Sequence, residues 1–396
     1  MRELGARRPA HVRPAVVVAL AAATVAIGHG FGRLSYPFLL PAMVDDLVGT
    51  YGRAGLLGTA NLGAYLLGLL VMIRFSGRVR LADFLAVGLL GVVAGLALMS
   101  VAPDYLVLIL AMVLAGGFNG ALWVPASALA ASAVSQRHRG LAAGALGVGS
   151  GLAIVLAGAL SRGVDSWRTV WAIEAVLGAV VLTVVLLRLP RVALEEPART
   201  GLGLGALRHL PGWIPLVVTY AAFALGYVLY TNYLVAALRD GAGFSPAAAA
   251  GAYSVLGLTS IVGGLLVGRV SDVIGRRWVL LAAHVLMAVC AAIVLLGSHP
   301  TAVLSAAVFG LFSTGLPAVV AAYVADHLEA SSVAAAFGVV TIAFGVTQTV
   351  APSLGGFLAD ATGGFRWTFL LAAAAHAVGA VAASLLPRPG AYATPR

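Results

Sequence analysis

Lysine is absent from the 396 residues, so all 24 basic side chains are arginines. Charged residues make up only 10% of the sequence, and Cys290 is the single cysteine. Without lysine there is no Gly-x-x-x-x-Gly-Lys loop for nucleotide phosphates, and one cysteine excludes an intramolecular disulfide. No metal-ligand spacing and no convergent Ser/His/Asp set is found. We therefore expect no cofactor, no metal and no enzyme activity.

Apolar side chains are abundant instead. They make up 61% of the chain, and the mean hydropathy is +1.02. One soluble core cannot bury that much apolar surface, so the sequence indicates a protein surrounded by membrane lipid. The net charge of +10 does not come from a basic patch interleaved with aromatic residues, and we expect no nucleic-acid partner.

Long apolar runs predict the fold class, an all-α membrane protein. A spanning helix needs about 20 apolar residues, and the runs lack the alternation of membrane strands. Arg7 and Arg8 before the first run resemble a twin-arginine signal, but that run is too long and many follow, so we interpret it as an uncleaved helix. The twelve predicted spans are 15–41, 54–73, 82–102, 105–131, 140–161, 168–188, 212–238, 246–268, 278–297, 301–325, 332–358 and 367–387.

The arginines predict the orientation. Eighteen of the 24 fall in the termini and in loops on one side of the predicted spans, five fall on the other side, and Arg33 lies inside the first span. Because cytoplasmic loops carry an excess of arginine, we expect both termini in the cytoplasm and an integral protein of the bacterial cytoplasmic membrane.

Two halves are predicted from a polar interval and a repeated segment. The interval separates residues 1–190, a six-helix bundle, from residues 212–396, a second one, with 191–211 as a cytoplasmic linker. Arg168 in Ser-Trp-Arg-Thr-Val-Trp and Arg366 in Gly-Phe-Arg-Trp-Thr-Phe lie half a chain length apart, each at the start of a span. This spacing favours duplication of a six-helix unit; the alternative is coincidence between two interfacial aromatic belts.

The loop at 264–277, Gly-Leu-Leu-Val-Gly-Arg-Val-Ser-Asp-Val-Ile-Gly-Arg-Arg, resembles the signature loop of the major facilitator superfamily. The resemblance implies two pseudo-symmetric six-helix bundles, a major facilitator fold. It also implies a gate in which Gly268, Asp272, Arg276 and Arg277 close the cytoplasmic side in one state. The alternative is a solvated basic loop. The first-half counterpart at 74–83 keeps its arginines but lacks the preceding acid, so a symmetric gate is not expected.

The first two helices and the seventh narrow the resemblance to the YbfB/YjiJ-like branch of this superfamily. That branch supplies no substrate. The matching segments are Gly32-Arg33-Leu34-Ser35-Tyr36, Leu39-Leu40-Pro41, residues 61–68, Gly226-Tyr227 and Phe244-Ser245.

The resemblance implies that helices one, four, seven and ten line a central cavity, which makes their polar residues candidates for substrate binding. His29, Arg33 and Tyr36 are spaced i, i+4 and i+7, on one helical face. Pro37 lacks the N–H that the Arg33 carbonyl would accept, so a kink is expected there. Charge at membrane depth indicates function, but an alternative is that Arg33 reaches the outer interface.

Further candidates for the cavity are Asn119 and Trp123 in helix four and Tyr227 and Tyr230 in helix seven. An aromatic stripe of this kind is also common in a packed core, so that alternative stays open. Asn61 in helix two is predicted to hydrogen-bond across helices as part of a packing face.

Glu174 is the only carboxylate well inside a predicted span. An acid there is a candidate site for proton coupling. The alternatives are an ion pair with Arg168 or an interfacial position.

The function predicted from these features is secondary active transport of a small organic solute. Arg33 and His29 favour an anionic or hydrogen-bonding solute, such as an organic anion, whereas the aromatic face of helix seven would suit an uncharged amphipathic one. A gradient must drive it, and the proton is the candidate coupling ion. We expect a monomer in membrane lipid. One alternative is a drug/proton antiporter that exports hydrophobic compounds, and a more distant one is a membrane receptor that does not transport.

Overall fold

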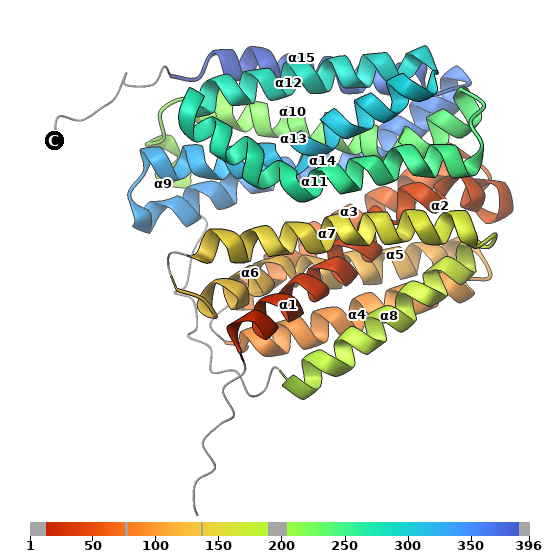
Figure 1. The fold of residues 1–396 in the computed structure, drawn as a ribbon, viewed down its shortest axis with the longest axis horizontal. Helices are drawn as coiled ribbons and strands as arrows, with labels where there is room; N and C mark the ends of the chain where they lie inside the picture. The colour runs from red at the N-terminus through yellow and green to blue at the C-terminus, as the bar shows by residue number, and fades with distance from the viewer. Residues whose placement is uncertain (1–12, 76–77, 136–137, 189–203, 388–396) are drawn as a thin grey trace, which may run out of the picture.

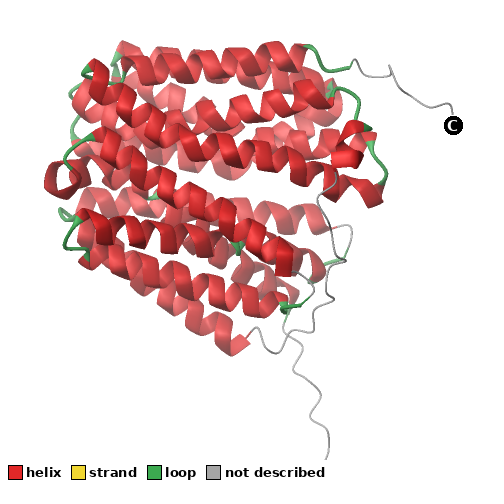
Figure 2. Ribbon diagram, turned by 180° about the vertical axis from the view of Figure 1, so that it is seen from behind, coloured by secondary structure: helices red, strands yellow, loops and turns green. Residues whose placement is uncertain are grey.

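The computed structural model describes residues 13–75, 78–135, 138–188 and 204–387, and Figure 2 shows helices joined by short loops. Twelve helical segments there are long and apolar enough to cross a membrane, which confirms the predicted spans. Most of the predicted linker 191–211 lies outside the described residues. The elements are α1 (Pro14–Val25), η1 (Ala26–Leu34), α2 (Tyr36–Met43), η2 (Val44–Val48), α3 (Tyr51–Phe75), α4 (Leu81–Val101), α5 (Tyr105–Gly120), α6 (Trp123–Ser132), α7 (Arg139–Gly163), α8 (Trp167–Arg188), α9 (Leu204–Arg208), α10 (Trp213–Ala236), η5 (Ala237–Gly241), α11 (Pro246–Ile274), α12 (Arg276–Ile293), η6 (Val294–Leu296), α13 (His299–His327), α14 (Ala330–Thr362) and α15 (Arg366–Ser384).

The helices form two bundles of six spans, one from α1 to α8 and one from α10 to α15, which lie one above the other in Figure 1. In the first bundle α3 packs on α5 and α4 packs on α8. Six spans later the same neighbours recur, with α11 on α13 and α12 on α15. This repetition confirms the predicted pair of pseudo-symmetric bundles.

Each bundle has the same two ends. The beginning of α1 and the end of α15 lie at one end, which we call the terminal end (Figure 1). The loops at 49–50, 102–104, 242–245 and 363–365 lie at the other end, which we call the distal end.

The first span is interrupted in its middle. Residues 26–34 form the π-helix η1, in which the Ser35 N–H bonds the Gly30 carbonyl five residues back at 3.1 Å. Pro37 follows within the first turn of α2 and has no N–H to donate. A π-helical segment inside a helix is rare and is frequently found at functional sites. The predicted discontinuity is therefore present, as a change in hydrogen-bond register.

Glycines let the two bundles meet backbone to backbone. A Cβ on Gly55 of α3 would lie 2.4 Å from the Pro352 carbonyl oxygen of α14, and one on Gly356 would lie 2.0 Å from the Tyr51 carbonyl oxygen. A second contact joins α7 and α11, where a Cβ on Gly151 would lie 2.9 Å from the carbonyl oxygen of Gly257. Small residues at such positions are what allow helices to approach closely in a membrane.

Candidate functional site

Arg33 lies where the two bundles meet. From η1 of the first bundle, its Nη2 donates a 2.7 Å hydrogen bond to Oε1 of Gln348 on α14 of the second bundle. Its guanidinium carbon also lies 5.9 Å from the ring centre of Tyr65 on α3, within range of a cation–π contact. Among the described residues no carboxylate pairs with Arg33. The predicted arginine is therefore half-buried between the bundles with its positive charge unbalanced.

A small cavity of about 10 Å³ lies beside Arg33, which is room for about one water molecule. Tyr36 lines it and donates a 2.7 Å hydrogen bond to the Ala54 carbonyl of α3. Asn61 also lines it, and its amide donates to the carbonyls of Gly32 at 3.2 Å and Met112 at 3.1 Å. These bonds confirm the predicted cross-helix role of Asn61. The full lining is Gly32, Arg33, Tyr36, Gly58, Asn61, Leu62, Met112 and Asn232.

His29 and Asn119 lie one turn closer to the terminal end than Arg33. The ring of His29 packs against Trp123 of α6, with centroids 5.2 Å apart. Asn119 of α5 lies against Gly28, the residue before His29. In the described part of the chain, neither Nδ1 of His29 nor Nδ2 of Asn119 has a hydrogen-bond partner. The site thus contains two polar atoms that a ligand or water can satisfy.

Four rings of the second bundle form what we call the aromatic cluster. It consists of Tyr220, Phe223 and Tyr227 of α10 and Phe344 of α14. The Tyr220 and Phe344 centroids are 4.6 Å apart, and those of Phe223 and Tyr227 are 5.3 Å apart. Phe344 is one helical turn before Gln348, the partner of Arg33. The predicted candidate Tyr227 therefore joins this group.

Tyr230 has a different position. Its hydroxyl shares a 2.6 Å hydrogen bond with Ser305, and its ring stacks on Phe309 with centroids 3.7 Å apart. The side chain is fully buried. These contacts all lie inside the second bundle, so Tyr230 packs in its core.

Glu174 is fully buried on α8. Its Oε1 accepts a 2.7 Å hydrogen bond from the Ser35 hydroxyl, while Oε2 has no partner among the described residues. The alternative ion pair with Arg168 is not formed, because Arg168 bonds Asp46 at the distal end. The carboxylate thus lies within the first bundle, bonded to the residue two positions after Arg33.

The signature loop joins helices of the second bundle. Arg276 pairs with Asp272 at 2.5 Å and with Asp326 of α13 at 2.9 Å, and Arg277 bonds the Ser384 carbonyl of α15. A Cβ on Gly268 would meet open space. The ion pairs of this predicted gate therefore connect α11, α12 and α13 at the terminal end.

The two bundles are joined at the distal end by contacts that the sequence did not predict. The Asp360 carboxylate of α14 accepts from the backbone N–H of Tyr51 at 3.0 Å and of Gly52 at 2.7 Å, at the start of α3. Arg239 and Asp45 form a second bond between bundles, at 3.0 Å. A carboxylate near the end of its own helix is unfavourable, which is a signal that Asp360 has another partner.

A buried histidine pair was also missed. His284 of α12 and His376 of α15 approach with their Nδ1 atoms 3.3 Å apart, and both are fully buried. Gly379 and Gly226 make room for the two rings. Histidine inside an apolar span was the available signal, but these spans were not expected to line the cavity.

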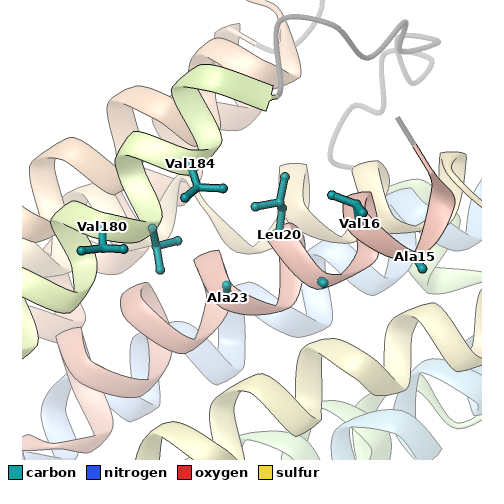
Figure 3. Close-up of a pocket in the computed structure, with 8 residues that line it drawn as sticks. Ala15, Val16, Leu20, Ala23, Val180 and Val184 are labelled. Carbon is teal, nitrogen blue, oxygen red and sulfur yellow. The ribbon is translucent and has the colours of Figure 1, made fainter. Parts of the chain in front are cut away.

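An apolar hollow, larger than the cavity beside Arg33, is lined by none of these groups. It has a volume of about 450 Å³, between α1 and α8 (Figure 3). Leu20, Ala23, Val180 and Val184 are among its lining residues, and they offer no polar side chain to a ligand. Such a surface suits contact with lipid chains.

Comparison with known proteins identifies the family. Residues 24–384 match the family described as "Uncharacterised MFS-type transporter YbfB", where MFS is the major facilitator superfamily. The chain is 25% identical over 357 residues to "Uncharacterized MFS-type transporter YfhI" of Bacillus subtilis (strain 168), with 89% of each chain covered.

The fold matches a solved transporter structure, that of a bacterial homolog to the human lysosomal transporter Spinster, in an inward-facing and unoccupied conformation. The TM-score is 0.74, the sequence identity 14%, and 96% of this chain and 97% of the other are covered. The likeness in fold agrees with the match in sequence. The chain belongs to the YbfB-type family of major facilitator superfamily transporters.

Proposed function

We propose that the protein is a secondary active transporter that moves a small organic anion across the membrane by alternating access, driven by a gradient with the proton as coupling ion. Membership of a transporter family supports transport. The observation that carries the choice of an anion is the unbalanced guanidinium of Arg33, which uses one of its five N–H donors on the neutral Gln348. A carboxylate accepts two such donors at once, with charge assistance.

Alternating access is supported by where the bundles are joined. Asp360 and Arg239 connect them at the distal end, whereas the ion pairs of Arg276 stay within one bundle at the terminal end. Rocking of the bundles about the level of Arg33 would separate them at the distal end and bring them together at the terminal end. The arginine excess of the terminal end supports a cytoplasmic position for it, in a bacterial cytoplasmic membrane.

The test is uptake into proteoliposomes under an imposed pH gradient, across a panel of organic carboxylates, for wild type and Arg33→Gln. Loss of a charge-assisted pair is expected to lower the apparent affinity about ten- to a hundredfold. Arg53→Gln is the matched control, because Arg53 lies at the distal end with its guanidinium carbon 4.1 Å from the Tyr105 ring centre. Equal uptake by Arg33→Gln and wild type would refute the proposal.

A drug/proton antiporter is the second candidate, favoured by the aromatic cluster, which suits an uncharged or cationic amphipathic compound. Export of hydrophobic cations with the same rate in wild type and Arg33→Gln would select it. Specific binding of a solute without its movement would instead select a receptor.

A further inference from the structure

The substrate must satisfy two neighbouring surfaces of different character. One is Arg33 with the polar atoms of its small cavity, and the other is the aromatic cluster. Gln348 and Phe344 connect them, since both lie on one face of α14 a single turn apart. A solute whose carboxylate replaces Gln348 at Arg33 would therefore lie within one helical turn of Phe344.

The aromatic cluster is partly open rather than sealed in a core. Phe344 and Tyr227 are half-buried, whereas Tyr220 and Phe223 of the same cluster are buried, as are core rings such as Tyr230 and Phe309. Its rings are stacked at small interplanar angles, 27° between Tyr220 and Phe344 and 23° between Phe223 and Tyr227. Rings in this arrangement offer flat faces on which another flat ring stacks.

From this juxtaposition we infer that the transported anion is a planar aromatic carboxylate. Its carboxylate pairs with Arg33, and its ring stacks on the aromatic cluster beside Phe344. The inference rests on the proposed function, to which it adds the chemical class of the substrate.

Nearby polar atoms suit substituents on such a ring. Nδ1 of His29 and Nδ2 of Asn119 are unpartnered, and Asn119 is almost fully buried. Both come from the first bundle, whereas the aromatic cluster belongs to the second. A ring hydroxyl can accept a hydrogen bond from Nδ2 of Asn119, and a ring hydroxyl or ring N–H can donate one to Nδ1 of His29, whereas a saturated aliphatic acid leaves both atoms unsatisfied.

The binding test measures the shift in melting temperature of the purified full chain with four probes. Benzoate, phenylacetate and indole-3-acetate carry planar rings, and cyclohexanecarboxylate has the same charge on a saturated ring. We expect at least one aromatic acid to bind about two- to tenfold more tightly than cyclohexanecarboxylate, from aromatic stacking. Phe344→Leu and Tyr220→Leu should bring that ratio close to one, while Phe344→Tyr should preserve it.

Control variants and measurements distinguish a loss of ring stacking from misfolding and from the loss of the Arg33 charge. Trp367→Leu removes an exposed ring on α15 and should leave the ratio unchanged. Melting temperatures without ligand report whether each variant is folded. Arg33→Gln should weaken binding of aromatic and saturated acids alike.

Three failures have different meanings. If all four acids bind wild type equally and Arg33→Gln weakens them all, the aromatic inference is overturned and anion transport stands. If no acid shifts the melting temperature, the aromatic inference is overturned, and the uptake panel decides the proposed function separately. If the acids bind Arg33→Gln as tightly as wild type, both the inference and the proposed function fall.

Discussion

The Ser35 hydroxyl donates a 2.7 Å hydrogen bond to Glu174, a carboxylate buried on α8, and Ser35 is only two residues from Arg33. The other oxygen of Glu174 has no partner in the described residues. Carboxylates inside the membrane are rare and mark substrate pathways, ion pathways or proton relays in transporters. A proton bound at Glu174 would thus be one hydrogen bond from the backbone that carries the proposed substrate contact.

Glu174→Gln should therefore uncouple transport from the pH gradient. The amide keeps the size of the side chain and its bond to Ser35 but cannot exchange a proton. We expect gradient-driven accumulation to be lost and exchange of solute across liposomes at equal pH to persist. Asp165→Asn, at an exposed acid near the distal end, is the control and should accumulate solute normally. Full accumulation by Glu174→Gln would rule out this coupling site.

Asp360→Ala should open the distal end. It removes a charged acceptor from two backbone N–H groups of α3, and hydrogen bonds to charged groups contribute about 1.5–3 kcal/mol each. Thr59→Cys, introduced with Cys290→Ala, reports the opening, because Thr59 bonds Ser353 between α3 and α14. Reaction with a membrane-impermeant maleimide should become about tenfold faster or more. An unchanged rate would mean that Asp360 does not hold the closure.

Gly55→Ala should block the closed distal arrangement. The added methyl would lie 2.4 Å from the backbone oxygen of Pro352, which has little freedom to move. Overpacking of this kind costs about 1–3 kcal/mol, so we expect slower transport and a lower melting temperature. Gly147→Ala on α7 is the matched control, because its new Cβ meets open space. Similar behaviour of the two variants would show that the α3–α14 approach is not a constraint.

Arg276→Gln should weaken the terminal end of the second bundle modestly. Its carboxylate partners Asp272 and Asp326 are about half exposed, so each pair contributes at most about 1 kcal/mol. We expect a small fall in melting temperature that disappears in high salt, where exposed pairs are screened. A fall that persists undiminished at high salt would show that the guanidinium acts through packing.

The spans and the duplication could be predicted because each depends on the chain's own pattern of apolar runs and arginines. The partners of side chains could not. Helical spacing placed His29, Arg33 and Tyr36 on one face, yet they contact α6, α14 and α3 respectively. The π-helical register of η1 changes the spacing, and only the packing of neighbouring helices decides which partner each residue meets.

Asp360 and the His284–His376 pair were missed for a related reason. Each acts through a residue far away in the chain, and neither belongs to a short motif. An acid at the C-terminal end of a helix and a histidine in an apolar run each indicate that a partner exists, but they do not identify which residue it is.

The break in the first span is maintained jointly by two helices. In the π-helical register the Gly32 carbonyl would accept from residue 37, but Pro37 has no N–H, and the amide of Asn61 on α3 donates to that carbonyl instead. The Asn61 amide also donates to the Met112 carbonyl of α5, and all of these residues belong to the first bundle. In the proposed rocking of the bundles, the break would therefore move as part of a rigid body, and the position of Arg33 relative to its own bundle would be preserved throughout the cycle.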